Sequence, residues 1–212
     1  MGLRFALRAA AVALYLPLLC LSPLAVAQGA EPAAAAQTAA DAALLLERSL
    51  AVPVEGVSPA ELHNTFSEGR PGHRHEAIDI AAPRGNKVFA VDGGKLVKLF
   101  TSVPGGLTLY QFDPQERFVY YYAHLDRYAD GLREGMTLQR CDLLGYVGTS
   151  GNAAAGAPHL HFAVFRLGPD KQWWQGTALD PYPALTALSR TGAAGGVVPP
   201  MTVARIPATP CH

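Results

Sequence analysis

Histidine and aspartate residues gather in three short segments of the sequence, and these residue types bind zinc and transfer protons in proteins. His75 and Asp79 are separated by three residues, His124 follows a run of tyrosines, and one residue separates His159 from His161. A catalytic zinc site has three protein ligands and one open position for a water, whose pKa falls to about 7. Five side chains are therefore enough for three ligands and two assisting groups, and the spacing alone leaves that division open.

The segment HLHF, residues 159–162, has the alternation of a half-buried β-strand. In a strand, side chains alternate between faces at about 3.3 Å per residue, so His159 and His161 point the same way about 7 Å apart. Leu160 and Phe162 then point into the core. One histidine alone is more often structural, and an H-x-H pattern arises easily by chance, but three such segments together favour a metal site.

The segment AIDIA, residues 77–81, alternates in the same way. Ile78 and Ile80 would lie on the core side and Asp79 on the polar side, four residues after His75. An alternative interpretation is the helical zinc motif H-E-x-x-H, because Glu76 follows His75, but Asp79 stands where that motif needs its second histidine. The isoleucines and the following Pro83 also oppose a long helix.

The elements that must position these residues are short β-type runs separated by turn residues. Asp92-Gly93-Gly94, Pro104-Gly105-Gly106 and Asp113-Pro114 have hairpin-turn compositions, which predicts a mainly β fold built on an antiparallel sheet. We expect strands near residues 77–81, 87–92, 95–102, 107–113, 117–125, 143–148 and 159–167. Short helices are predicted at both ends, over 41–50 and from 183 to 190.

The chain starts with features of an export signal. Arg4 and Arg8 precede an apolar run that ends in Ala25-Val26-Ala27, which predicts a cleavable signal peptide over residues 1–27. An uncleaved anchor is the alternative, because the run is long enough to span a bilayer, but Pro17 and Pro23 favour cleavage. We therefore expect a periplasmic or secreted protein without stable membrane insertion.

The remaining chain is close to neutral. Cleavage would leave 15 basic against 17 acidic residues, so the composition indicates no nucleic-acid partner. An Ala-rich spacer and short helix are expected over 28–51, one folded domain over 52–188 and a Gly/Pro-rich tail over 189–212. Cys141 and Cys211 would remain, and a disulfide between them is expected in an oxidising compartment, with two free thiols as the alternative.

The three segments, HEAIDIAAPRG from His75, YYAHL from Tyr121 and PHLHF from Pro158, resemble the lysostaphin and LytM type of zinc endopeptidase. The resemblance extends from about Pro53 to Pro183. It implies a small antiparallel sheet whose flanking loops form a narrow groove over one zinc ion per chain.

By the same resemblance, His75, Asp79 and His161 are the zinc ligands, and His124 and His159 act in catalysis. The sequence departs from the family pattern at Ala77, at Asn86-Lys87 and at Cys141, none of which is a ligand or a catalytic histidine.

The resemblance implies a peptidase that hydrolyses the peptide cross-links of bacterial peptidoglycan, with a D-alanyl bond to a diamino acid as the expected target. Two alternatives stay open. Some relatives have lost their zinc ligands and only activate another cell-wall hydrolase, and a general extracellular metalloprotease would use the same residues.

Overall fold

The computed structural model describes residues 30–48, 50–191 and 211 of the 212-residue chain. The expected signal peptide over 1–27 and most of the expected tail lie outside these residues. In the part that is described, no helix is both long and apolar enough to cross a lipid bilayer.

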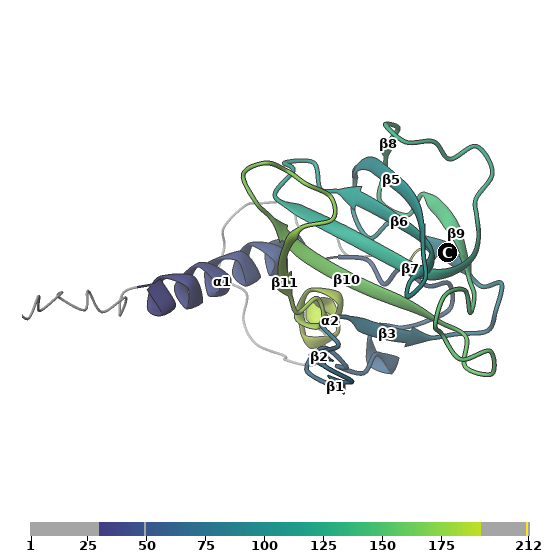
Figure 1. Cartoon of the computed structure of the whole chain (residues 1–212), viewed down its shortest axis with the longest axis horizontal. Helices are drawn as coiled ribbons and strands as arrows, with labels where there is room; N and C mark the ends of the chain where they lie inside the picture. Colours follow the sequence, from purple (N-terminus) through teal and green to yellow (C-terminus); the bar gives the residue numbers. More distant parts are fainter. Residues whose placement is uncertain (1–29, 49, 192–210, 212) are drawn as a thin grey trace, which may run out of the picture.

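Antiparallel strands dominate the fold, and the predicted mainly β class is confirmed (Figure 1). Within the described residues, nine strands join in one sheet with the main order β11-β10-β7-β6-β5-β8, while β3 pairs with β10 and β9 pairs with both β4 and β7. A separate hairpin is formed by β1 and β2. The strands are β1 (Gly69–Arg70), β2 (His73–Arg74), β3 (Ile78–Ala81), β4 (Lys87–Phe89), β5 (Gly94–Ser102), β6 (Gly106–Phe112), β7 (Phe118–Tyr128), β8 (Thr137–Leu138), β9 (Leu143–Val147), β10 (His159–Leu167) and β11 (Gly176–Leu179).

All seven expected strands are present, with ends that differ by a few residues. The sequence pattern did not predict β1, β2, β8 or β11. Two-residue strands are too short to show alternation, and β11 is recognised only through its pairing with β10, from Val164↔Leu179 to Leu167↔Gly176.

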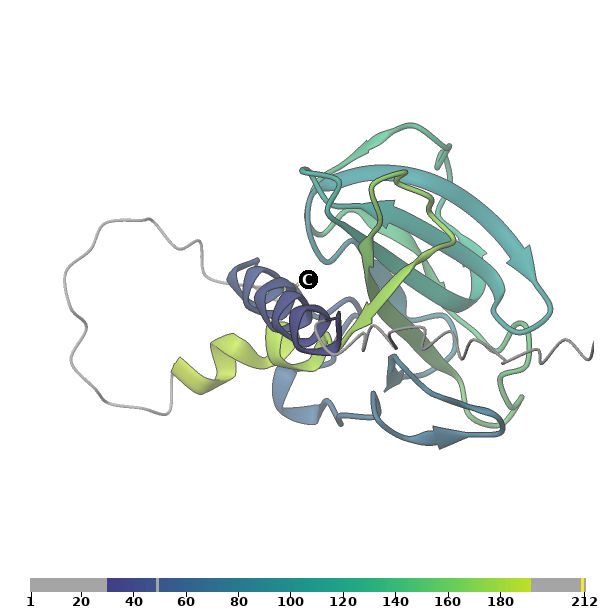
Figure 2. The ribbon, with the colours of Figure 1, turned by 60° about the vertical axis from the view of Figure 1, so that its left-hand side comes forward.

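Helices α1 (Ala30–Glu47) and α2 (Tyr182–Thr191) lie side by side at one side of the sheet (Figure 2). The C-terminal helix is confirmed. The N-terminal helix starts earlier than the predicted 41–50, because residues 30–40, which the composition left as a flexible or weakly helical spacer, form the first part of α1. Alanine has the highest helix propensity, which favours a helix through residues 34–40 although their side chains stay exposed. The second half of α1 docks on the domain, where Leu45 is buried in the main core and Asp41 accepts a hydrogen bond of 2.8 Å from Arg166 of β10.

The main core lies on one face of the sheet and explains why the polar residues face the other way. Ile78 and Ile80 of β3 are buried, as are Leu160 and Phe162 of β10, so the predicted alternation of both strands is confirmed. Each fully buried side chain of this size stabilises the fold by about 1.5–3 kcal/mol.

A disulfide joins Cys141 to Cys211, with a Cα–Cα distance of 5.3 Å. The expected pairing is confirmed. Ala51 and Phe89 form a small apolar cluster around Cys211, so the residue next to the chain end is held against the β4–β9 region.

Candidate metal centre

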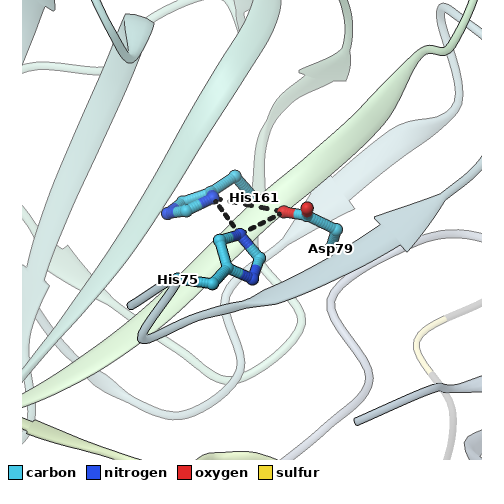
Figure 3. A group of neighbouring side chains, drawn as sticks. All are labelled: His75, Asp79 and His161. Atoms are coloured by element: carbon cyan, nitrogen blue, oxygen red, sulfur yellow. Dashed lines mark hydrogen bonds and ion pairs between the residues drawn. The ribbon is translucent and has the colours of Figure 1, made fainter. Parts of the chain in front are cut away.

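His75, Asp79 and His161 point toward one another from three parts of the chain (Figure 3). Nε2 of His75 lies 3.0 Å from Oδ1 of Asp79 and 3.1 Å from Nδ1 of His161, and the last two atoms are 3.1 Å apart. The three donor atoms therefore form a nearly equilateral triangle. Four ligands arranged as a tetrahedron around zinc, at bonds of about 2.0–2.1 Å, lie about 3.3 Å from one another.

The sheet brings two of these residues together directly. In the antiparallel pair of β3 and β10, Asp79 is the register partner of His161, and directly opposed side chains share a face. His75 lies between β2 and β3, where Glu76 has φ 55° and the chain turns into the sheet. The residues from His75 to Asp79 are not helical, which agrees with the rejection of the helical zinc motif.

Thr65 contacts both ends of the H-x-x-x-D segment. Its backbone carbonyl oxygen lies 3.0 Å from Nδ1 of His75, and its Oγ1 accepts a hydrogen bond of 3.0 Å from the backbone N–H of Asp79. Since a carbonyl oxygen can only accept, Nδ1 carries the hydrogen and Nε2 keeps its lone pair toward the triangle. No sequence motif marks Thr65, because its role depends on its position in the fold.

Arg70 holds the other carboxylate oxygen of Asp79. Its Nη2 lies 2.9 Å from Oδ2 of Asp79, which leaves Oδ1 directed at the two histidines. Glu68, at 3.4 Å, is a second partner of the same guanidinium nitrogen. No zinc-binding motif marks Arg70 either, because arginine is not a zinc ligand.

The electrostatics of the site favour the forms that bind a cation. Burial lowers the pKa of His75 below its ordinary value, although the charge of Asp79 opposes this. Burial raises the pKa of Asp79, but the hydrogen bond from His161 and the nearby imidazoles outweigh it, and the net shift is downward. The two shifts favour an unprotonated His75 ring and an ionised Asp79 carboxylate.

His124 reaches the site through a β-bulge. The register between β6 and β7 changes from Leu109↔Tyr122 to Leu107↔Leu125, and His124 itself has φ 61°. A bulge of this kind inserts one extra residue into the strand. It turns the following side chain to the face opposite the one that strict alternation would give it. The backbone N–H of His124 donates to the carbonyl of Gly105 at 2.8 Å, which holds this conformation.

Strict alternation in 120–124 would place Tyr120, Tyr122 and His124 on one face, but the bulge separates His124 from the two tyrosines. Both tyrosines are fully buried in the main core, as expected of ordinary sheet packing. Tyr121 lines the site instead, with its ring centroid 5.9 Å from that of His161.

The two remaining histidines have the same hydrogen-bonding pattern. Nδ1 of His124 donates to the carbonyl of Ser150 at 2.8 Å, and Nδ1 of His159 donates to the carbonyl of Ala157 at 2.9 Å. In each neutral ring Nε2 is therefore the nitrogen with a lone pair. Nε2 of His159 lies 3.7 Å from Oδ1 of Asp79, and the rings of His124 and His159 are 4.9 Å apart. Burial lowers the pKa of His124, which favours its neutral form.

A cavity of about 470 Å³ opens over all five residues. The β1–β2 hairpin supplies one wall with Arg70, Pro71 and His73. Further lining residues come from the β5–β6 turn and from the loop before β10, namely Pro104, Gly105, Asn152, Ala153 and Ala154. The geometry is that of an open cleft in which three donor atoms suited to zinc face two histidines with free lone pairs.

Comparison with known proteins places this site in a family. The sequence model of peptidase family M23 matches residues 73–181, which is 109 of the 212 residues and includes all five side chains. The chain belongs to peptidase family M23. The predicted resemblance to lysostaphin-type and LytM-type peptidases is thereby confirmed.

A curated relative of this M23 chain is the L-Ala–D-Glu endopeptidase of Bacillus subtilis (strain 168), which is 30% identical over 130 residues. The match covers 58% of this chain and 38% of the relative, so the chain spans well under half of that protein's length.

Two solved structures share the fold of this M23 chain. Lysostaphin from Staphylococcus simulans has a TM-score of 0.53 at 23% identity, covering 73% of this chain and 59% of that one. A putative glycyl-glycine endopeptidase LytM from Ruminococcus gnavus has a TM-score of 0.55 at 23% identity, covering 68% and 63%.

Proposed function

We propose that this protein is an exported zinc endopeptidase that hydrolyses peptide cross-links of bacterial peptidoglycan. The observation that carries the proposal is the convergence of Nε2 of His75, Oδ1 of Asp79 and Nδ1 of His161 within 3.1 Å of one another, beside His124 and His159. The membership of family M23 supports the same reaction class.

His75, Asp79 and His161 would hold one zinc ion per chain. Two imidazoles and one carboxylate suit this borderline cation, and three ligands leave a position open for water or substrate. A zinc ion held there supplies a Lewis acid that polarises the scissile carbonyl and lowers the pKa of water to about 7. Thr65 and Arg70 keep the ligand atoms aimed at that position.

His159 and His124 would move the proton. With Nδ1 bound to a backbone carbonyl, each neutral ring can accept a proton at Nε2, and the ring that accepts it becomes a donor there. Nε2 of His159 lies 3.7 Å from Oδ1 of Asp79, and His159 is the proposed general base. His124, once charged or through a water, would donate to the oxygen that becomes negative in the transition state.

The substrate class is proposed from chemistry and from the relative together. The name of the curated relative specifies a bond between L-Ala and D-Glu. Peptides that contain D-amino acids are characteristic of bacterial cell walls, and an open cleft accepts an extended peptide. Within this class we retain the D-alanyl bond to a diamino acid as the proposed target, and a signal peptide over 1–27 would deliver the enzyme to the wall.

The decisive experiment measures cleavage of purified wall peptides by mass spectrometry. Wild type should release new amino termini, chelation should stop this, and added Zn²⁺ should restore it. His124→Ala and His159→Ala should retain zinc and lose cleavage, whereas His161→Ala should lose both. Exposed His63 provides the control, because His63→Ala should change neither.

Other outcomes would replace the proposal. A protein that leaves wall peptides intact but stimulates a purified cell-wall amidase is an activator. Efficient digestion of casein at the rate seen for wall peptides identifies a general protease. Full zinc occupancy in His161→Ala would remove His161 from the ligand set.

A further inference from the structure

Aromatic side chains form a continuous path away from the metal centre. The ring centroids of His161 and Tyr121 lie 5.9 Å apart, those of Tyr121 and Tyr110 4.6 Å, those of Tyr110 and Trp173 4.7 Å, and those of Trp173 and Trp174 5.1 Å. All these distances are within the range of direct aromatic contact.

The path follows the sheet face that carries the metal ligands. In the pair of β7 and β10, Ala123 opposes His161, Tyr121 opposes Ala163, and Val119 opposes Phe165. Side chains at these alternate positions share one face. Phe165 follows His161 by four positions in β10, or about 13 Å, so the aromatic end of the face lies outside the reacting centre but along the same strands.

Ordinary packing accounts for only one of the two tryptophans. Trp173 covers a small cluster formed by Phe112, Val119 and Leu167, which is the expected role of a residue in such a loop. Trp174 is 62% exposed and has no comparable cover. An exposed indole next to other aromatic rings is typical of a ligand-binding surface.

A cavity of about 240 Å³ lies at this surface and shares a wall with the metal cleft. Tyr121 lines both cavities, and the aromatic one is completed by Tyr110, Phe165, Trp173, Trp174, Gln175 and Gly176. A polymer bound in the metal cleft can therefore continue onto the aromatic surface without leaving the sheet.

The chemistry of the surface indicates a sugar as the occupant. Pyranose rings have faces of C–H groups that pack on aromatic rings, while their hydroxyl and acetamido groups need hydrogen-bond partners at the edge. Gln175 lines the aromatic cavity, and Gln172 and Thr177 line a neighbouring hollow of about 280 Å³. Flat aromatic rings edged by amides and a hydroxyl fit this occupant better than an apolar protein segment.

We propose that the surface formed by Tyr110, Trp173, Trp174 and Gln175 binds the amino-sugar strand of peptidoglycan while the attached peptide lies in the metal cleft. This inference rests on the proposed function. Phe165, which lines the aromatic cavity, lies about 13 Å from His161 along β10, and a peptide of about four extended residues spans that distance.

The test uses full-length mature protein with zinc and a hexamer of β-1,4-linked N-acetylglucosamine as the probe. Trp173 and Trp174 are the two tryptophans of the sequence, so selectively excited tryptophan fluorescence reports on this surface alone. The hexamer should shift the emission of wild type saturably. Calorimetry should show affinity falling about three- to tenfold in Trp174→Ala and largely retained in Trp174→Phe.

Leu46→Ala is the matched control, because Leu46 is 44% exposed but lies on α1. This variant should bind the hexamer like wild type. Kinetics give a second readout: Trp174→Ala should raise KM for glycan-linked peptides by a similar factor and leave cleavage of sugar-free peptides unchanged.

Two results would overturn the proposal: no saturable response in wild type, or equal affinities of wild type and Trp174→Ala. In either case a protein partner would replace the sugar strand as the proposed occupant of the surface. The proposed function is tested by a different result from the one that tests the sugar-binding surface. Loss of zinc-dependent cleavage of sugar-free peptides concerns the metal centre, whereas loss of hexamer binding with that cleavage intact concerns the aromatic surface alone.

Discussion

The backbone carbonyl oxygen of Thr65 accepts a hydrogen bond of 3.0 Å from Nδ1 of His75 and so selects which nitrogen of that ring faces the metal position. The Thr65 hydroxyl also accepts the backbone N–H of Asp79 at 3.0 Å and donates to the carbonyl of Ala77 at 3.1 Å. One residue outside the proposed ligand set thus orients the segment that carries two proposed ligands.

Replacing the Thr65 hydroxyl should weaken the site. Thr65→Val leaves the N–H of Asp79 without its acceptor, which should lower the free energy of unfolding by about 1–2 kcal/mol. Zinc affinity should fall as well, because the carboxylate is less well placed. Thr65→Ser keeps the hydroxyl and should restore both quantities in urea unfolding and zinc titration. Equal zinc affinities in Thr65→Val and Thr65→Ser would contradict the role of the hydroxyl.

Arg70 should be needed for tight zinc binding. Arg70→Gln removes the charged partner of Oδ2 of Asp79. Loss of such outer contacts typically costs about 10–100-fold in metal affinity, and partial exposure of Arg70 places the expectation at the lower end. Competition with a chelating dye would measure it. Arg74→Gln, on the same hairpin but exposed, is the control and should bind zinc like wild type.

Zinc should stabilise the folded protein through the ligand triangle. A ligand that binds only the folded state at 100 times its Kd adds about 2.7 kcal/mol to the free energy of unfolding. Wild type should therefore melt at a higher temperature with Zn²⁺ than with a chelator. This difference should vanish in Asp79→Ala and persist in His63→Ala. A zinc-dependent shift of the same size in Asp79→Ala would argue that the metal binds elsewhere.

The absence of a side chain at Gly106 should be required for the position of His124. A Cβ at Gly106 would lie 2.2 Å from Oγ and 2.3 Å from the carbonyl carbon of Ser150, whose carbonyl oxygen accepts from His124. Gly106→Ala should therefore displace His124 and lower kcat by about 10²-fold while zinc stays bound.

Gly131→Ala separates this effect from backbone strain. Gly131 has φ +80° and Gly106 has φ +64°, but a Cβ at Gly131 would meet no atom within 4 Å. Both variants have a strained backbone, and only Gly106→Ala has the steric clash. Similar losses of kcat in the two variants would show that strain and not displacement is responsible.

The disulfide should contribute substantially to stability. Cys141 and Cys211 are 70 residues apart, and closing a loop of this length restricts the unfolded chain. Cys141→Ser combined with Cys211→Ser should lower the free energy of unfolding by about 2–4 kcal/mol, measured with urea. Wild type in a reductant should show the same loss. Cleavage at temperatures well below unfolding should be unchanged, because neither sulfur lies in the metal cleft.

Much of the fold and of the site could be predicted from the sequence alone. Alternation in β3 and β10 is a local property, so the inward side chains of Ile78 and Leu160 and the outward ones of Asp79 and His161 follow from residue order. Turn residues mark the hairpins, and the spacing of the histidines identifies the family. These features depend on near neighbours in the chain.

Only the tertiary structure decided the features that depend on contacts between distant segments. A bulge, invisible in the residue pattern, turns His124 into the cleft and leaves Tyr122 in the core. Thr65 acts through its backbone carbonyl and its hydroxyl, and no motif in the sequence marks either group as part of the site. The second half of α1 is fixed against the folded domain because Leu45 is buried in the main core and Asp41 accepts a hydrogen bond from Arg166. Residue types and spacing determined which groups are available for chemistry, and packing decided how they are aimed.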